Sequence, residues 1–371
     1  MAYIKKYLFI LVFLCFSSLI FSFNFLSLKW SFIDTQNENI IVKGTEKDGN
    51  YIAFQSISKE QYTNILSFTK EGTVTSKVKI SNFNFIDYQI LEENLYMLGT
   101  YNSAGTNFLS LICMDKDYNV LFRKYYSKGN ISPINIRTYG NELIITANSV
   151  SSEKSTLYLF TVDKYTNIIQ ENSYEFSMTL EIKDSVITND MLYMTGFLDN
   201  KESKLDLFVK SINLKTKKFV LEKVWGAKYN EVGTKIIPSE GYLIIVGTNE
   251  SFNEIKTRDV WVMKISATGD TVWSRIYDSS FIDEVNDACV DEMENIYITG
   301  TSITQESQDL FVLKLNKFGE KLYFDIDKDK ETNLSSFIFE DSSNIILGGY
   351  FINTDTGSDT SVSTGIIMVL N

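Results

Sequence analysis

The chain has 371 residues, which is too many for one ordinary hydrophobic core unless a repeated unit divides that core among its copies. Aromatic residues make up 14% of the sequence and proline occurs only 2 times, a composition typical of many packed strands and not of a disordered chain. The formal net charge of -12 argues against nucleic acid or an anionic membrane as partner, and the absence of His removes the commonest general base and metal ligand.

The N-terminal segment predicts export from the cytoplasm. Lys5 and Lys6 precede a run from Tyr7 to Leu28 that carries no charge. This order of a positive region and an apolar region is typical of a signal peptide, and Ser22 offers a tolerable cleavage position. The run is also long enough to span a bilayer. Residues 1–25 are therefore either a cleaved signal peptide or a membrane anchor, and both alternatives place residues 26–371 in an extracytoplasmic compartment, secreted, periplasmic or anchored.

From there onward the sequence repeats. A short apolar strand that ends on a small residue recurs at Gly99, Ala147, Gly196, Gly247, Gly300 and Gly349, in steps of 48 to 53 residues. A second strand follows each of these, as in DLFVKSI, DVWVMKI and DLFVLKL, and in most copies a tight turn and a further strand come next. A four-stranded blade of a β-propeller needs about this much chain.

The two ends of the chain complete one blade. Seven third strands can be counted, but only six of them are followed by a fourth strand, since Asn371 comes directly after GIIMVLN. The missing strand is at the N-terminus, where residues 28–34 (LKWSFID) match residues 272–278 (VWSRIYD) in Trp, Ser and the closing Asp. We therefore predict an all-β fold: a single seven-bladed β-propeller domain of four-stranded antiparallel blades, with the ring closed by the N-terminal strand.

Loop lengths predict where function resides. The turns between the first and second strands and between the third and fourth strands are short, whereas residues 249–258, 302–308 and 353–364 form long polar connections between second and third strands. Such connections share one face of a propeller, and binding residues are usually carried on loops that a rigid scaffold holds. We call this the long-loop face and expect the functional surface there.

The recurrent polar residues have structural interpretations. Asp206, Asp259 and Asp309 begin successive third strands, and their blade period predicts that they accept hydrogen bonds from turns or neighbouring blades and do not bind one metal. Trp225 and Trp273 recur in register with Trp30, so we expect them to pack between outer strands. Cys113 and Cys289 fall in blades 2 and 6 and are expected to be free, buried thiols.

One acidic segment could hold a metal. Asp325, Asp327 and Asp329 alternate in the connection after blade 6, and alternate carboxylates can converge on Ca²⁺. Lysine occupies positions 328 and 330, and position 330 is where a calcium-binding loop of the EF-hand type requires Gly. A solvated acidic loop without metal is therefore the preferred interpretation, and no other cofactor site is predicted.

The repeats resemble those of secreted bacterial seven-bladed β-propellers. Residues 259–273 and 309–323 carry the pattern D-x-[FW]-V-x-K-[IL]-x-x-x-G-[DE]-x-x-[WY], and WGAKYNE at 225–231 is similar to the blade junction of such repeats. The resemblance extends over roughly 205–350. It implies the fold and export, and it implies no catalytic residue.

Two functions remain open at this stage. The first is a non-enzymatic binding or assembly module of the cell envelope, expected to be a monomer, with an envelope protein or a polysaccharide as ligand. The alternative is an extracytoplasmic enzyme, either a polysaccharide lyase or hydrolase or a degenerate quinoprotein, since propellers host all of these. The absence of His, and of carboxylate pairs at readable spacing, favours binding over catalysis.

Overall fold

The computed structural model describes residue 26 and residues 28–34, 40–57, 60–126, 131–200, 204–251, 257–279, 281–305, 307–327, 332–341, 344–354 and 361–370. Every regular element within these ranges is a β-strand. The predicted signal or anchor at residues 1–25 lies outside the described residues, and so does Asp329.

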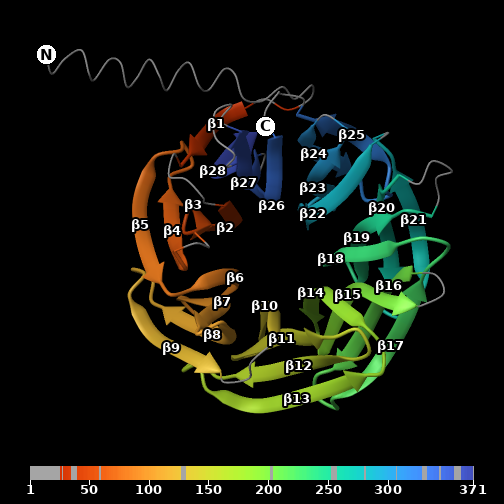
Figure 1. Cartoon of the computed structure of the whole chain (residues 1–371), viewed down its shortest axis with the longest axis horizontal. Coiled ribbons are helices and arrows are strands. Elements are labelled where there is room, and N and C mark those ends of the chain that lie inside the picture. The colour runs from red at the N-terminus through yellow and green to blue at the C-terminus, as the bar shows by residue number, and fades with distance from the viewer. Residues whose placement is uncertain are drawn as a thin grey trace, which may run out of the picture. The chain divides into compact units, whose positions relative to one another are not determined.

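The strands form seven four-stranded antiparallel sheets, so the chain is a seven-bladed β-propeller as predicted (Figure 1). Blade 1 contains β2 (Ile40–Lys47), β3 (Asn50–Ile57), β4 (Tyr62–Phe68) and β5 (Val74–Ser81). Blade 2 contains β6 (Asn84–Leu91), β7 (Asn94–Ser103), β8 (Thr106–Met114) and β9 (Val120–Tyr126). Blade 3 contains β10 (Ser132–Tyr139), β11 (Glu142–Val150), β12 (Ser155–Val162) and β13 (Ile168–Phe176). Blade 4 contains β14 (Leu180–Thr188), β15 (Met191–Asn200), β16 (Lys204–Asn213) and β17 (Lys218–Trp225).

The remaining blades follow the same order. Blade 5 contains β18 (Glu231–Ser239), β19 (Tyr242–Asn249), β20 (Asp259–Ser266) and β21 (Thr271–Tyr277). Blade 6 contains β22 (Ile282–Val290), β23 (Ile296–Ile303), β24 (Gln308–Leu315) and β25 (Lys321–Ile326). Blade 7 contains β26 (Thr332–Asp341), β27 (Asn344–Thr354), β28 (Ser361–Leu370) and β1 (Leu28–Ile33).

The chain forms two compact units. Unit 1 comprises Met1–Ala53, Leu66–Ser76 and Asn286–Asn371, and unit 2 comprises Phe54–Ile65 and Lys77–Val285. Each unit is described by itself below.

In unit 1, the N-terminal strand completes blade 7, which confirms the prediction made from the LKWSFID match. β1 pairs antiparallel with β28, with Trp30 opposite Val369 and Phe32 opposite Ile367. The Trp30 ring lies 6.0 Å from the Phe68 ring, and its indole N–H donates to the carbonyl of Lys70 at 2.9 Å. Trp30 thus packs against neighbouring aromatic side chains, as expected.

In unit 2, blades 2 to 5 are arranged as an arc in which each first strand lies on the inner side and each fourth strand on the outer side (Figure 1). Buried apolar side chains from consecutive blades form one cluster between each pair of sheets. Ile145 and Leu98 belong to the cluster between blades 2 and 3, Leu192 and Leu157 to the next, and Trp261 and Leu207 to the one between blades 4 and 5. The core is therefore divided among blade interfaces, as the length of the chain requires.

The turns between third and fourth strands are as tight as predicted. In blade 5 the turn is closed by hydrogen bonds from Gly269 N to Ser266 O at 2.9 Å and from Ser266 N to Asp270 O at 2.9 Å, and Gly269 has a φ of 82°. Glycine adopts this left-handed conformation without the steric cost that a Cβ atom imposes. The prediction about long connections needs correction. β7 and β8 are joined by residues 104–105 alone, β11 and β12 by residues 151–154, and β23 and β24 by residues 304–307, so the connection predicted at 302–308 is short and the long connections are those of blades 5 and 7.

Candidate functional site

The connection between β19 and β20 in blade 5 is held at both ends by polar side chains. Arg258 donates to Glu250 Oε1 through Nε at 3.0 Å and through Nη2 at 2.8 Å, and its Nη1 donates to Glu284 Oε1 at 2.5 Å. The other oxygen of Glu250 accepts from Asn230 Nδ2 at 2.7 Å. Arg258 keeps 34% of its side chain exposed and Glu284 keeps 46%, so this part of the long-loop face is rigid and also accessible. Residues 252–256 lie outside the described residues.

Three aspartates gather beside this connection. The register of β20 with β21 pairs Val260 with Tyr277, which places Asp259 opposite Asp278. The backbone N–H of Asp283 donates to the carbonyl of Arg258 at 2.7 Å, so Asp283 comes next to the same strand end. Asp259 is 1% exposed and Asp283 is 0% exposed, whereas Asp278 is exposed. The carboxylate of Asp283 accepts from Ser279 Oγ at 2.6 Å and from Ser279 N at 3.3 Å.

Burial and neighbouring charge change the acidity of this site. Burial raises the pKa of Asp259 to about 7, with further contributions from the charges of Asp278 and Asp283 and from a hydrogen bond with Asp278, while a hydrogen bond with Thr257 acts in the opposite direction. A carboxyl group with this pKa changes its charge near neutral pH, unlike an ordinary aspartate.

Glu231 occupies the position in β18 that Asp283 occupies in β22, at the beginning of the first strand. Burial raises the pKa of Glu231, helped by Asp206 and Glu250, although a hydrogen bond with Ser251 and one from the backbone N–H of Ala227 lower it. The corresponding positions in blades 2, 3 and 4 hold the buried apolar residues Phe83, Ile131 and Leu180. Within unit 2, the acidic character of this strand end is therefore a property of the later blades.

Two of the recurrent aspartates accept hydrogen bonds at the turn before their own strand, which is one of the two alternatives predicted. Asp206 accepts from Asn200 Nδ2 at 2.9 Å and Asp309 accepts from Ser307 Oγ at 2.8 Å. Asn200 is the last residue of β15, and Ser307 lies in the connection just before β24. Each of these two aspartates therefore helps to fix the turn before its own strand.

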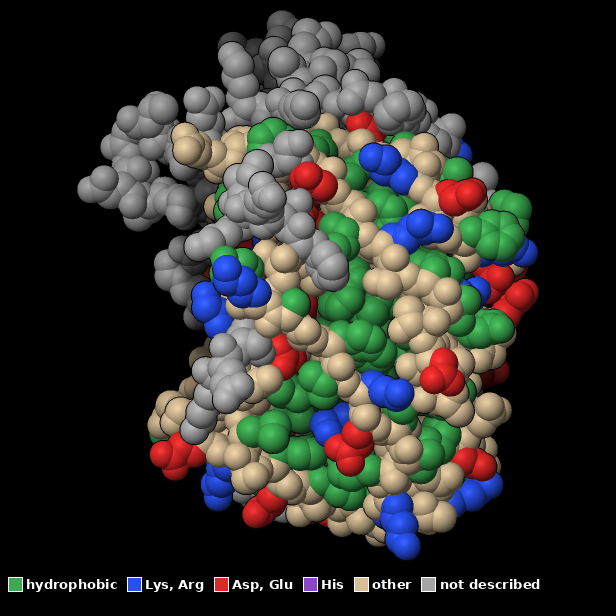
Figure 2. Space-filling model, turned by 90° about the vertical axis from the view of Figure 1, so that its right-hand side faces the viewer, with side chains coloured by type: hydrophobic (Ala, Val, Ile, Leu, Met, Phe, Trp, Pro, Cys, Tyr) green, Lys and Arg blue, Asp and Glu red, His purple; other side chains and the backbone are tan. Residues whose placement is uncertain are grey.

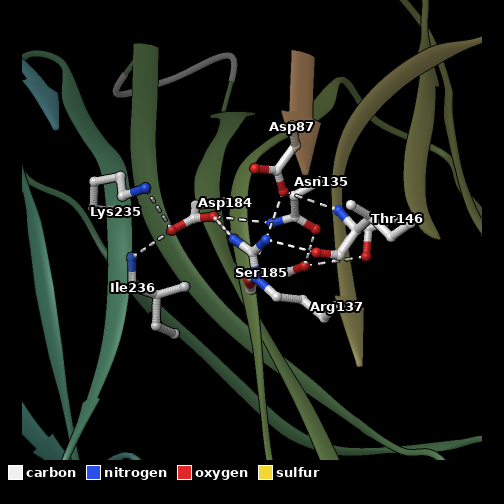
Figure 3. Close-up of polar contacts among 9 residues, drawn as sticks. Asp87, Asn135, Arg137, Thr146, Asp184, Ser185, Lys235 and Ile236 are labelled. Carbon is white, nitrogen blue, oxygen red and sulfur yellow. Dashed lines mark hydrogen bonds and ion pairs between the residues drawn. The ribbon is translucent and has the colours of Figure 1, made fainter. Parts of the chain in front are cut away.

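A second set of aspartates joins consecutive blades and lies on the first strands, near the middle of each strand, as Figure 3 shows for Asp87 and Asp184. Asp87 on β6 accepts from the backbone N–H of Ile136 on β10 at 3.0 Å, and Asp184 on β14 accepts from the backbone N–H of Ile236 on β18 at 3.2 Å. In unit 1, Asp287 on β22 accepts from the backbone N–H of Ile338 on β26 in the same way at 3.1 Å. Each bond ties a first strand to the first strand of the following blade.

Arg137 on β10 joins two of these aspartates. Its Nη1 donates to Asp87 Oδ2 at 2.6 Å, its Nη2 to Asp184 Oδ1 at 3.2 Å, and its Nε to the carbonyl of Ser185 at 3.0 Å (Figure 3). Burial disfavours the charged guanidinium, but the carboxylates of Asp87 and Asp184 outweigh burial and raise the pKa of Arg137. Lys235 Nζ lies 3.5 Å from Asp184 Oδ2, so two carboxylates face two cations. The charges balance, and the arrangement is that of a structural clamp.

Sequence reasoning missed this clamp, although a signal was present. Asp87, Asn135, Asp184, Lys235 and Asp287 recur at the blade period, and the first four each follow a shift of register in the pairing of first and second strands. The bulge turns the next side chain toward the neighbouring blade. A periodic search restricted to polar residues would have found the positions, but not the bulge.

The structure places two of the three predicted metal ligands. Asp325 lies on β25 opposite Val312, Asp327 follows that strand with its N–H donating to Leu310 O at 2.9 Å, and both side chains are 0% exposed. The expectation of a solvated loop is therefore wrong for Asp325 and Asp327, whose strand end is packed inside the blade. Over the described part of the chain no three His, Cys, Asp or Glu side chains form a group suited to a metal ion. Because Asp329 is not described, the calcium alternative remains untested.

A pocket of about 560 Å³ opens beside blade 3, between the β11–β12 connection and the end of β13. Its lining consists of Ser151, Ser152, Glu153, Lys154, Glu175, Phe176 and Ser177. The rim is fixed, because Ser151 Oγ donates to Lys154 O at 2.8 Å and Thr179 Oγ1 donates to Ser151 O at 3.0 Å. The pocket offers hydroxyl groups, carboxylates and one aromatic ring to a ligand.

The outer strands expose scattered apolar side chains. Val220 and Val224 on β17 are 65% and 48% exposed, and Val272 on β21 is 53% exposed. The side of the molecule seen in Figure 2 shows apolar side chains with charged side chains of both signs among them. Single exposed apolar residues of this kind are normal on a soluble domain. Neither Cys113 nor Cys289 forms a disulfide within the described ranges; Cys113 is buried, whereas Cys289 is only partly buried.

No helix long and apolar enough to cross a membrane occurs in the described ranges, which exclude residues 1–25.

Comparisons with known proteins identify a fold and no family. No protein-family model matches the chain, and no curated protein matches it. Among solved structures, Sqt1 from Chaetomium thermophilum matches with a TM-score of 0.52 at 8% identity, covering 93% of this chain and 99% of that one. The AfRom2 CNH domain matches with a TM-score of 0.51 at 10% identity, over 93% and 99% of the two chains.

A third structure bears on how the blades close. The β-propeller domain of the Trilobed protease from Pyrococcus furiosus, described as having an open velcro topology, matches with a TM-score of 0.50 at 11% identity over 89% of this chain and 95% of that one. In the present chain β1 pairs with β28, so blade 7 is built from both ends of the sequence. At these identities the likeness establishes the fold alone: the chain is a seven-bladed β-propeller whose N-terminal strand completes its last blade.

Proposed function

We propose that the chain is a non-enzymatic binding or assembly module of the cell envelope that acts outside the cytoplasm through the long-loop face. The observation that carries this proposal is the connection between β19 and β20, whose ends are held by the Arg258–Glu250–Asn230 hydrogen bonds. A connection fixed at its ends loses less conformational entropy on binding than a free one, and so binds more tightly for the same contacts.

An envelope protein or a polysaccharide fits this surface better than an anionic partner. The exposed groups at this end of blade 5 include the carboxylates of Asp278 and Glu284, and the blade 3 pocket presents the carboxylates of Glu153 and Glu175 with one ammonium, that of Lys154. Carboxylates repel nucleic acid and anionic lipid, whereas they accept hydrogen bonds from hydroxyl and ammonium groups.

One observation favours the alternative of an enzyme. Asp259 has a pKa of about 7, and a carboxyl group with a pKa near neutrality is suited to general acid–base catalysis. Its side chain, however, is 1% exposed, so a substrate has no access to it in this conformation. Burial thus accounts for the pKa without catalysis and keeps binding as the preferred function.

The test is capture of envelope components by the purified chain after shortening its loops. One variant replaces residues 250–258 by a two-residue turn, a second replaces residues 355–360, and a third combines both. A matched control replaces the β20–β21 turn at 267–270 with another tight turn of equal length. We expect the combined variant to melt as one transition but to lose capture of extracted envelope protein and of immobilised cell-wall polysaccharide, while the control retains it. Capture that survives the combined shortening would contradict the proposed binding surface. A measurable turnover that Asp259→Asn abolishes would favour the enzyme alternative.

A further inference from the structure

The blade 3 pocket lies on the long-loop face. One wall is the β11–β12 connection, residues 151–154, and the other is the end of β13, which lies beside the start of β12 because Phe176 pairs with Ser155. All of its lining belongs to residues 131–200, which the structure describes without a gap. The volume of about 560 Å³ falls within the roughly 300–1,000 Å³ of typical ligand pockets. The pocket is therefore large enough for a small ligand.

Hydroxyl groups hold the two walls of the pocket together. Thr179 Oγ1 donates to Ser151 O at 3.0 Å, which ties the segment after β13 to the β11–β12 connection. Ser155 Oγ donates to Met178 O at 2.9 Å and accepts from Leu180 N at 3.1 Å, which ties the same segment to the start of β12. The pocket is thus formed before any ligand arrives, and a preformed site loses less conformational entropy on binding.

The lining offers exposed charged groups of both signs beside one aromatic side chain. Glu153, Lys154 and Glu175 are exposed, so two carboxylates can accept hydrogen bonds from a ligand and one ammonium group can donate to it. Phe176 is half-buried, and its ring packs edge-on against the Phe219 ring at 5.9 Å. The aromatic side chain is therefore fixed in place and still has surface available to the pocket.

This combination distinguishes between classes of ligand. A cation would meet Lys154 in the lining and the ammonium group of Lys210, which lies 5.6 Å from the centre of the Phe176 ring. An anion would meet the carboxylates of Glu153 and Glu175. A neutral sugar avoids both repulsions, because each of its hydroxyl groups can donate to a carboxylate or accept from an ammonium group, and its C–H face packs on an aromatic ring.

We propose that the blade 3 pocket binds a neutral sugar unit of a polysaccharide. Glu153 and Glu175 accept hydrogen bonds from the sugar hydroxyl groups, Lys154 donates one, and Phe176 packs against the sugar ring. The biological role of this site rests on the proposed function, but sugar binding is measurable without capture of any envelope component. A single preformed pocket with these few polar contacts should bind a soluble oligosaccharide with a Kd on the order of 1 mM, too weak to retain a polymer through washing.

The test is a saturation-transfer NMR titration of the purified chain with soluble tetrasaccharides. The neutral probes are cellotetraose, maltotetraose and the tetramer of N-acetylglucosamine. The charged probes are the tetramer of glucosamine, which is cationic, and tetragalacturonate, which is anionic. We expect at least one neutral probe to bind, and to bind more tightly than either charged probe.

Variants of exposed side chains assign the binding to the pocket. Glu175→Ala should raise the Kd of the neutral probe about tenfold, since a hydrogen bond to a charged group is lost. Lys154→Ala should also weaken binding, whereas at a site for cations it would strengthen binding. The matched control is Glu171→Ala, an exposed glutamate on the same face of β13 that does not line the pocket, and it should bind as the unaltered chain does.

Three results would overturn the proposal. One is that no neutral probe binds. The second is that a charged probe binds most tightly, which for the glucosamine tetramer would assign the pocket to cations and for tetragalacturonate to anions. The third is an unchanged Kd in Glu175→Ala, which would place the sugar elsewhere on the chain.

The pocket and the proposed function can fail separately. The combined loop-shortened variant keeps blade 3 intact, so it should bind the neutral tetrasaccharide as the unaltered chain does. Capture that survives the shortening would contradict the proposed binding surface and leave the pocket standing. Tetrasaccharide binding that disappears with the loops would instead contradict the pocket, because the site would then lie in those loops.

Discussion

Arg137 forms ion pairs with two buried carboxylates and keeps 21% of its own side chain exposed. It lies between Asp87 and Asp184, whose side chains are 1% and 7% exposed. Taking these groups out of water costs free energy that their mutual attraction and hydrogen bonds offset. The clamp therefore specifies which first strands are neighbours, and its net stabilisation is smaller than the number of its bonds suggests.

Removing the cation alone should be costly. We expect Arg137→Met to lower the free energy of unfolding by about 3–5 kcal/mol, because it leaves two buried carboxylates facing only Lys235. The matched control is Lys183→Met on β14, whose exposed ammonium pairs with Glu181 at 2.6 Å. That change should cost less than about 1 kcal/mol, as surface ion pairs do. Urea denaturation of both variants measures the difference, and equal losses would contradict the clamp.

A second residue-scale prediction concerns Gly226, which follows β17. A Cβ atom at this position would lie 1.9 Å from Asp206 Oδ1, so the carboxylate occupies the space of any side chain. Gly226→Ala should destabilise the chain by roughly 1–3 kcal/mol, the usual range for overpacking. In an Asp206→Ala background the same change should cost much less, which a double-mutant cycle measures. Additive effects would show that the two residues do not compete for space.

At the scale of the element, the sequence predicted the third strands well but predicted the first strands only in part. Runs such as DVWVMKI on β20 are apolar along their length, because both faces of the strand pack against neighbouring blades. Such a run predicts a buried strand from the sequence alone. The bulge before Asp184 has no such signature, since it depends on how β14 pairs with β15. Asp325 and Asp327 were misread for a related reason: alternating charge is typical of a solvated loop, and only the register of β25 shows that both side chains are enclosed.

The sequence predicted where the candidate site lies, but it did not predict which charged groups meet there. The length and polarity of residues 249–258 predicted a long connection in blade 5, and the structure has one at residues 250–258. The aspartates that come together there, Asp259, Asp278 and Asp283, belong to three different strand ends, and single-sequence spacing cannot show that they meet. The raised pKa of Asp259 depends on its burial, which is a property of the folded blade.

The N-terminal strand β1 should be essential to blade 7. Its aromatic residues pack into the cluster that contains Phe68 and Val369, and Phe32 lies 4.9 Å from the Phe68 ring. A chain that begins at residue 35 should have a markedly lower melting temperature than one that begins at residue 27, because the edge of β28 and the face of Phe68 would both be exposed to water. Equal melting temperatures would mean that β1 is dispensable.

At the scale of the whole molecule, a seven-bladed fold whose core is divided among blade interfaces separates stability from function. The clusters within unit 2 each join two consecutive blades, so a substitution at one interface leaves the others intact. Loops at the strand ends can then vary in length, as the β7–β8 and β19–β20 connections do, without a cost in the core. This is why propellers with unrelated functions share the fold and why the fold alone assigns none.

The central structural claim is that the two ends of the described chain form one blade, and an engineered disulfide tests it most directly. Ser31 on β1 is the register partner of Met368 on β28. Residues opposite each other in an antiparallel pair have Cα atoms roughly 4.5–5.5 Å apart, a spacing that a disulfide can bridge. The account predicts that Ser31→Cys with Met368→Cys gives a 31–368 link on oxidation, identified by mass spectrometry of the unreduced digest, and a melting temperature above that of the reduced form. A digest without this link, or a link that leaves the melting temperature unchanged, would contradict it.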